Sequence, residues 1–364
     1  MRRNSLFIYS VILAVVYLFI GTALACEITE SQFEPKDRMA YQLGKLAGKV
    51  GLANLKLKNL KPGELLVITN AGNCRFNNDS TMAAIEGISW ATDTSPGKGN
   101  LLRISSTRNA NPWFFIFHRP SGEGVFLEAP TMAKGELTSQ IFKVKKENIA
   151  AKRLLEDPTT WDNKVKERIF QGREFTIVTF ANQWAAGAPY DLLRTGEFHD
   201  HVCPGVTMGY MIAAYLERHL PLGQGDRYYF ISTAPNCHDD ALQVLFNATS
   251  GKKFFTTLPM TEAQKTLMPS RWKNLTGIYV VYNERAQTGR AIALTFDWDL
   301  LQTKREGIGW AWRLRMNQEL LGLLDKPEKF LSKVHEFELP AGVAPADLLQ
   351  ADNKTLRDIG FIEK

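Results

Sequence analysis

Apolar and polar positions along the chain fall into two similar successions of predicted elements. "ELLVITNAGNC" (64–74) and "RYYFISTAPNC" (227–237) are apolar runs that predict buried strands entering a turn. Helix-like segments follow at 80–89 and 240–249, and both lead to a Gly-Lys pair. Further on, residues 112–129 and 277–298 each predict a β-hairpin around a Gly-containing turn. The pattern therefore predicts an α+β protein in which helix, strand, turn, helix and hairpin occur twice.

The two apolar runs also match residue by residue without a gap. The matched pairs are Ile68 with Ile231, Thr69 with Ser232, Ala71 with Ala234, Asn73 with Asn236 and Cys74 with Cys237. The spacing indicates a duplication of about 120 residues rather than a short-period solenoid. We therefore expect a first half over 26–150 and a second half over 151–364. The second half would begin with a charged helical stretch and end with a C-terminal extension whose Met and Trp residues belong to the core.

The N-terminal sequence predicts a targeting segment. A short basic start precedes about twenty apolar residues that end in Ala23-Leu24-Ala25, an A-x-A cleavage signature. Residues 1–25 are therefore interpreted as a cleaved secretory signal peptide. Two alternatives are a retained membrane anchor and a lipid on Cys26. All three place the folded part in the periplasm or otherwise outside the cytoplasm.

Composition and charge narrow the class of protein. The chain has 364 residues, 45% hydrophobic and 23% charged, which is an ordinary globular composition for roughly two domains. Its formal net charge of +6 falls to +4 without Arg2 and Arg3, and no basic stripe stands out, so we expect no nucleic-acid partner. Four cysteines are too few for a disulfide scaffold, although export would permit a disulfide.

The candidate chemistry is concentrated in "FHDHVCPGVTMGY" (198–210). In an extended segment, His199, His201 and Cys203 would project to the same side. Imidazole nitrogen and thiolate sulfur are ligands that zinc and similar transition metals prefer. Pro204 and Gly205 then lead into a helix expected over roughly 206–219. A polar loop with chance histidines is the alternative interpretation.

Cys237 is the expected fourth ligand. It ends a predicted strand just before a helix that Asp239 or Asp240 could cap, and thiols near a helix N-terminus have lowered pKa values. Four protein ligands would make a closed, structural site, whereas three would leave a coordination position for water or substrate. Asp240 and His238 are then candidates for orienting a ligand or for proton transfer. A Cys203–Cys237 disulfide is the remaining alternative.

The first half lacks this block. Phe198 and Gly209 have counterparts in Phe33 and Gly44, but the two histidines and the cysteine are replaced by Glu34, Lys36 and Arg38. We expect Cys74 to be a buried thiol and the remaining histidines to be structural. The "PGKGN" sequence at 96–100 lacks the spacing of a phosphate-binding loop.

These blocks resemble the FmdE family, named after a component of formylmethanofuran dehydrogenase. The family pattern is F-H-G-H-x-C-P-G-x-x-x-G-[YF], then C-x-x-D-A-[IV]-Q, then T-x-G-K-G-N. The matching positions are His199, His201, Cys203, Pro204, Gly205 and Gly209, then Cys237, Asp240, Ala241 and Gln243, then Thr249, Gly251 and Lys252. The resemblance covers roughly 165–300 closely and 30–130 faintly. Asp200 stands where the family often has Gly.

The resemblance implies a metal-binding α+β core, commonly with zinc, in two tandem copies that would form a pseudo-dimer within one monomer. The C-terminal zinc finger of some members is absent, because the chain has no C-x-x-C. We therefore expect an extracytoplasmic metal-binding protein whose partner is a small molecule or a metal cofactor. A metal-dependent enzyme and an interaction module with a structural metal are the alternatives. The membrane would be a partner only through the leader or Cys26.

Overall fold

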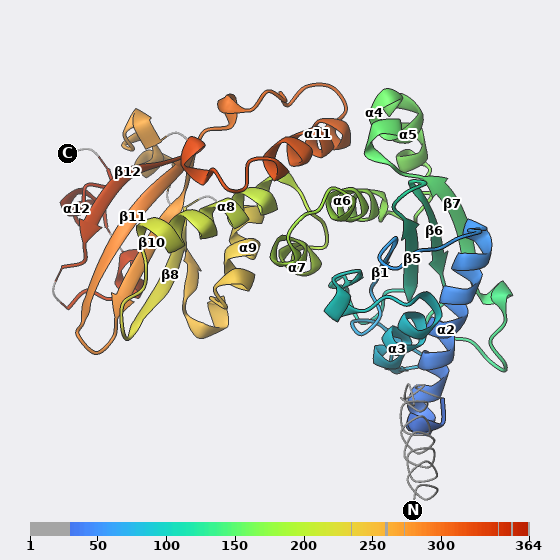
Figure 1. The fold of residues 1–364 in the computed structure, drawn as a ribbon. Coiled ribbons are helices and arrows are strands. Elements are labelled where there is room, and N and C mark those ends of the chain that lie inside the picture. Colours follow the sequence, from blue (N-terminus) through green and yellow to red (C-terminus); the bar gives the residue numbers. More distant parts are fainter. Residues whose placement is uncertain are drawn as a thin grey trace, which may run out of the picture.

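A computed structural model describes residues 30–362, except 234, 259, 260, 273, 341 and 351. Two β-sheets lie on either side of a central group of helices (Figure 1). The predicted signal peptide and Cys26 lie outside the described residues. Among the helices that are described, none combines the length and the apolar character needed to span a bilayer.

The first sheet has five strands in the order β4-β1-β5-β6-β7. Only β1 and β4 run parallel, with Val67 opposite Leu101, and all other neighbours are antiparallel. The strands are β1 (Leu65–Thr69), β4 (Leu101–Arg103), β5 (Trp113–His118), β6 (Glu123–Glu128) and β7 (Lys143–Asn148). Both faces of β1 and β5 are buried, which explains why their sequences are continuously apolar.

The second sheet repeats this arrangement, with the order β9-β8-β10-β11-β12. Again the first two strands in chain order are parallel, with Phe230 opposite Phe255, and the others are antiparallel. The strands are β8 (Asp226–Ser232), β9 (Phe255–Thr257), β10 (Leu275–Asn283), β11 (Thr288–Phe296) and β12 (Leu331–Glu338). The α+β prediction is confirmed, and the two sheets have matching strand orders.

We call the first half (26–150), with the first sheet, the first unit, and the second half (151–364), with the second sheet, the second unit. The Gly-Lys pairs occupy equivalent turns in these two units. The ammonium of Lys98 contacts the backbone and side-chain oxygens of Asp93, and that of Lys252 contacts the same two oxygens of Asn247. Asp93 and Asn247 both have φ of 53°. Each lysine therefore stabilises the turn after a helix, which gives the "PGKGN" sequence a structural role.

The matched cysteines do not occupy equivalent positions. In the second unit, Cys237 is the first residue of helix α9 (Cys237–Leu245). In the first unit, a short hairpin of β2 (Arg75–Phe76) and β3 (Asp79–Ser80) separates Cys74 from helix α3 (Met82–Thr92). The inserted hairpin shifts the helix along the sequence, so the ungapped match holds for the strands and not for the two cysteines.

Each unit has a pair of closely crossing helices on its sheet. Helix α2 (Pro35–Leu55) crosses α3 in the first unit, and α8 (Pro204–His219) crosses α9 in the second. A Cβ at Gly44 would lie 1.9 Å from the carbonyl oxygen of Ala84, and one at Gly209 would lie 2.6 Å from that of His238. Glycine is therefore required where the backbones touch, which explains why Gly44 and Gly209 match in the sequence.

A shared core joins the first sheet to residues that follow position 150. The helices involved are α4 (Ala151–Glu156), α5 (Pro158–Lys166), α6 (Glu174–Ala185), α7 (Tyr190–His199) and α11 (Gly309–Leu321). Phe115 and Phe126 of the first sheet pack with Phe170, and the same cluster contains Leu192 and Trp310. The expected boundary at 150 thus falls between the two sheets, but helices that follow it complete the hydrophobic core of the first sheet.

Residues from the second half also close one edge of the first sheet. The carboxylate of Glu197 in α7 accepts a hydrogen bond from the backbone N–H of Arg103 at 2.6 Å, and its carbonyl oxygen accepts one from Ser105 at 2.8 Å. These bonds satisfy backbone donors at the outer edge of β4 that a neighbouring strand would otherwise satisfy.

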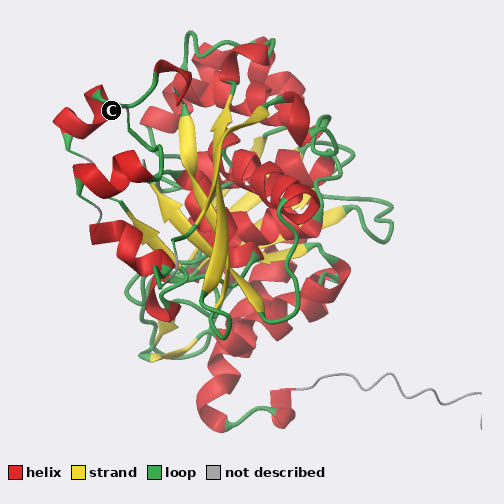
Figure 2. Cartoon of the chain, turned by 90° about the vertical axis from the view of Figure 1, so that its left-hand side faces the viewer, coloured by secondary structure: helices red, strands yellow, loops and turns green. Residues whose placement is uncertain are grey.

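The C-terminal segment covers the outer face of the second sheet, where Leu356 and Phe361 pack against Ile278 and Val280. Figure 2 shows the molecule from this side, with short helices beside the strands. These helices include α10 (Glu262–Thr266) and α12 (Asn353–Asp358).

We predict that Gly44→Ala destabilises the protein, because the new methyl group forces α2 away from the backbone of α3. Overpacking of this kind typically costs about 1–3 kcal/mol in the free energy of unfolding, measurable by urea denaturation. The control is Gly97→Ala, where the nearest atom to a new Cβ is the Ser95 hydroxyl at 3.9 Å. Equal effects of the two substitutions would contradict the proposed crossing.

Candidate metal centre

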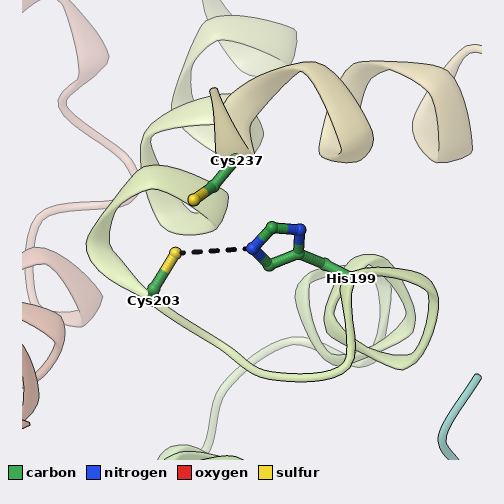
Figure 3. A group of neighbouring side chains, drawn as sticks. All are labelled: His199, Cys203 and Cys237. Carbon is green, nitrogen blue, oxygen red and sulfur yellow. Dashed lines mark hydrogen bonds between the residues drawn. The ribbon is translucent and has the colours of Figure 1, made fainter. Parts of the chain in front are cut away.

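Three helix ends bring a histidine and two cysteines together (Figure 3). His199 is the last residue of α7, Cys203 is the residue before α8, and Cys237 begins α9. Their ligand atoms lie within 4.8 Å of one another, and the Cys203 Sγ is 3.9 Å from the His199 Nε2. The structure therefore unites three of the four predicted ligands, although Cys237 belongs to a separate segment of the chain.

The spacing and type of these donors fit a zinc ion. Tetrahedral zinc with bonds of about 2.3 Å to sulfur and 2.0–2.1 Å to nitrogen places neighbouring ligand atoms about 3.6–3.8 Å apart. The Cys203–His199 separation already approaches this value. Gly205 lets Cys237 approach closely, since a Cβ at position 205 would lie only 2.9 Å from the Cys237 Cβ. Small movements of the side chains would bring all three donors to bonding distance.

Asp240 orients the histidine. Its Oδ2 accepts a hydrogen bond from the His199 Nδ1 at 2.6 Å, and its Oδ1 accepts one from Gln243 at 3.4 Å. This bond fixes the proton on Nδ1 and directs Nε2 towards the thiols, an arrangement common among metal-binding histidines. Asp240 thus has the orienting position that was one of its two predicted roles.

The same contacts shift the ionisation of the three donors. Burial would lower the pKa of His199, but Asp240 and Cys237 outweigh it and raise that pKa to about 9. Hydrogen bonds from the Cys203 thiol and from His199 lower the pKa of Cys237 to about 4. The neighbouring Cys237 and burial raise the pKa of Cys203. These shifts favour a thiolate on Cys237 beside a protonated His199.

His201 lies outside the group of three. The prediction that 199–203 is extended is wrong, because His199 still belongs to α7 and Asp200 reverses the chain with φ of 75°. The His201 Nδ1 is 2.5 Å from the Asp200 carboxylate, and its ring packs edge-on against Phe175 at 5.0 Å. Its ring nevertheless remains 4.5 Å from that of His199, at the side of the centre.

Buried polar residues from distant helices hold this turn. The Thr179 hydroxyl accepts a hydrogen bond from the Val202 N–H at 3.2 Å, and the Asn317 amide donates one to the Val202 carbonyl at 2.5 Å. Thr207 donates to the Cys203 carbonyl at 3.2 Å. No sequence pattern pointed to Thr179 and Asn317, because their role depends on contacts between segments far apart in the chain.

His238 points away from this chemistry. Its buried ring donates from Nε2 to the Thr276 carbonyl in β10 at 2.9 Å, so it connects α9 to the second sheet. The N-terminal cap of α9 is Asn236, whose N–H donates to Asp239 at 3.0 Å in a capping box. The interpretation of His238 as a proton-transfer group is therefore not supported, and the predicted cap is displaced to Asn236.

The described cysteines are free thiols. No disulfide joins Cys203 to Cys237, and Cys74 is buried beside the Thr81 hydroxyl at 3.5 Å. Among the other histidines, His118 bonds to Ser121 and His219 to Glu328, contacts that fit structural roles.

Comparison with known proteins gives a match for the region around this centre. Residues 198–333 match the family model FmdE, described as "Molybdenum formylmethanofuran dehydrogenase operon". A solved structure of a tungsten formylmethanofuran dehydrogenase FmdE-like protein from Syntrophus aciditrophicus is 20% identical, with a TM-score of 0.28; the match covers 44% of this chain and 74% of that one. No curated protein matches the chain. The resemblance noted in the sequence is thus supported for residues 198–333.

We predict that the two cysteines of the centre differ in reactivity in metal-stripped protein. Cys237 is expected to react with iodoacetamide from about pH 5 upward, since its pKa is about 4, while Cys203 stays unreactive at neutral pH. Peptide mapping after alkylation measures both. Cys74, whose pKa is raised by burial, serves as the unreactive reference until the protein is unfolded. Equal labelling of Cys203 and Cys237 would contradict this assignment.

Proposed function

We propose that the protein binds a transition-metal ion, most favourably zinc, through His199, Cys203 and Cys237. The observation that carries this proposal is the convergence of the three donor atoms within 4.8 Å at three helix ends. The hydrogen bond from His199 to Asp240 adds support, because a metal-binding histidine commonly donates its other ring N–H to a carboxylate. The family match over 198–333 includes all three residues.

Three protein ligands leave one coordination position of a tetrahedral ion for a small molecule or water. We therefore infer that the protein binds a small molecule or presents its metal as a cofactor. Asp200 and Phe175 hold His201 beside the centre, where it could contact such a ligand. A purely structural site in an interaction module has less support, because His201 does not complete a set of four donors.

A metal-dependent enzyme acting on a small molecule is the second candidate. A bound zinc ion would supply Lewis-acid activation of a substrate or of water. Within this chain, Asp240 would keep His199 oriented, and the His201–Asp200 pair would provide a polar contact at the side of the centre. The open coordination position favours this candidate, and no substrate is implied by the residues around it.

The first half would serve as a scaffold in this proposal. Its crossing helices and strand order match those of the second half, which supports a tandem duplication and an internal pseudo-dimer. Among the described residues, the group of His199, Cys203 and Cys237 is the one that could hold a metal, and the first half contributes none of its donors, so we propose a single metal site per chain.

We predict that the mature protein carries about one zinc ion or other transition-metal ion per chain, measured by elemental mass spectrometry. His199→Ala, Cys203→Ala and Cys237→Ala should each remove it, and Asp240→Asn should weaken its affinity about 10–100-fold. His201→Ala and Cys74→Ala are the controls that retain it. Loss of metal in His201→Ala as complete as in Cys203→Ala would show a closed site of four ligands.

We further propose that the protein is exported and acts outside the cytoplasm, on the basis of the apolar leader and its A-x-A signature. N-terminal sequencing of protein from an extracytoplasmic fraction should find Cys26 as the first residue. A chain that begins at Met1 in the membrane fraction would favour the anchor instead, and a soluble cytoplasmic chain with Met1 would contradict export.

A further inference from the structure

A groove of about 620 Å³ lies between the first unit and the N-terminal part of α7. Its walls include Pro62 and Gly99 from the first unit and Trp184, Tyr190 and Leu193 from α6 and α7. This volume lies within the range of about 300–1,000 Å³ that small-molecule sites commonly have. The groove is distinct from the metal centre, which lies at the opposite end of α7.

Arg119 is the free cation of this groove. The other lysine or arginine in the lining, Lys98, is engaged by Asp93 in the turn described above. Within the described part of the chain, Arg119 forms no ion pair with a carboxylate, although it contributes to the lining. Its guanidinium is therefore available to an anion.

Trp184 holds this guanidinium in place. The Arg119 Cζ lies 5.2 Å from the centre of the Trp184 ring, and the indole N–H donates to the Gly99 carbonyl at 3.1 Å. Stacking on an aromatic ring leaves the in-plane N–H groups of arginine free for a carboxylate. The indole is itself anchored to the first unit, so the position of Arg119 is fixed by residues of both halves.

The rest of the lining is mixed. Asp93 and Asn100 contribute polar atoms, with the Asp93 carboxylate engaged by Lys98, and Pro62 is an exposed apolar residue. Leu193 is buried, and Tyr190 is 41% exposed at the groove.

Tyr282 occupies the position in the second sheet that corresponds to Arg119. In the first sheet His118 pairs with Leu65, and in the second sheet Val281 pairs with Tyr228 at the equivalent place. Arg119 and Tyr282 are the residues that follow His118 and Val281. The cation is therefore a feature of the first unit alone and does not follow from the common fold.

We propose that this groove binds a small organic carboxylate with an apolar ring, its carboxylate on Arg119 and its ring against the exposed Tyr190 and Pro62. The site would give the first half a binding role of its own. The proposal does not depend on metal binding, because none of the three metal-site donors lines the groove.

Isothermal titration calorimetry with benzoate tests the proposal on the full-length mature protein. Saturable binding is expected, at least about tenfold weaker in Arg119→Gln and intermediate in Arg119→Lys, which keeps the charge but loses the planar fork. The matched control is Arg305→Gln, because Arg305 stacks on Trp298 at 4.7 Å in the other unit. Benzyl alcohol, the neutral analogue, should bind at least about tenfold more weakly than benzoate.

No saturable benzoate binding by the wild-type protein would overturn the proposal. So would wild-type affinity in Arg119→Gln, or an equal loss in Arg305→Gln. Arg119 is exposed, so its substitutions should leave the circular dichroism spectrum and the metal content unchanged. Benzoate binding that persists after the metal is removed separates this site from the metal centre.

Discussion

The close contact between α8 and α9 is the constraint on which the metal centre depends. Gly209 lets the two helix backbones meet, and Gly205 admits the Cys237 side chain beside Cys203. The capping box at Asn236 then starts α9 at Cys237, the residue that would supply a thiolate to the proposed metal. Because Cys203 and Cys237 lie at the N-terminal ends of two packed helices, their separation is set by this packing and not by a flexible loop. His199 is brought to the same point by the turn that Thr179 and Asn317 stabilise.

The first unit shows that this packing and the metal chemistry are separable. Gly44 makes an even closer approach to α3 than Gly209 makes to α9, yet no metal-binding group forms there among the described residues. A glycine therefore serves the helix crossing in both units, whereas His199, Cys203 and Cys237 come together in the second unit. The two halves thus have similar strands and crossing helices although their candidate chemistry differs.

Local patterns in the sequence predicted much of the fold. Apolar runs placed β1 and β8 at matching positions of their sheets, and the Gly-containing turns placed both hairpins. The His/Cys block and Cys237 also pointed to the region of the centre. The departure at His201 could not be foreseen, because it follows from the end of α7 and from the positive φ of Asp200. Long-range partners such as Asn317 likewise leave no local pattern, and the inserted hairpin misled the match of Cys74 with Cys237.

The closure of β4 by Glu197 has a consequence for how the protein is made. During synthesis, all five strands of the first sheet leave the ribosome before α6 and α7 do. Until then, the inner face of that sheet and the backbone donors of Arg103 and Ser105 lack the partners found in the finished protein. The nascent first unit is thus incomplete and open to improper strand pairing, and a chain truncated near residue 150 would retain this exposed state.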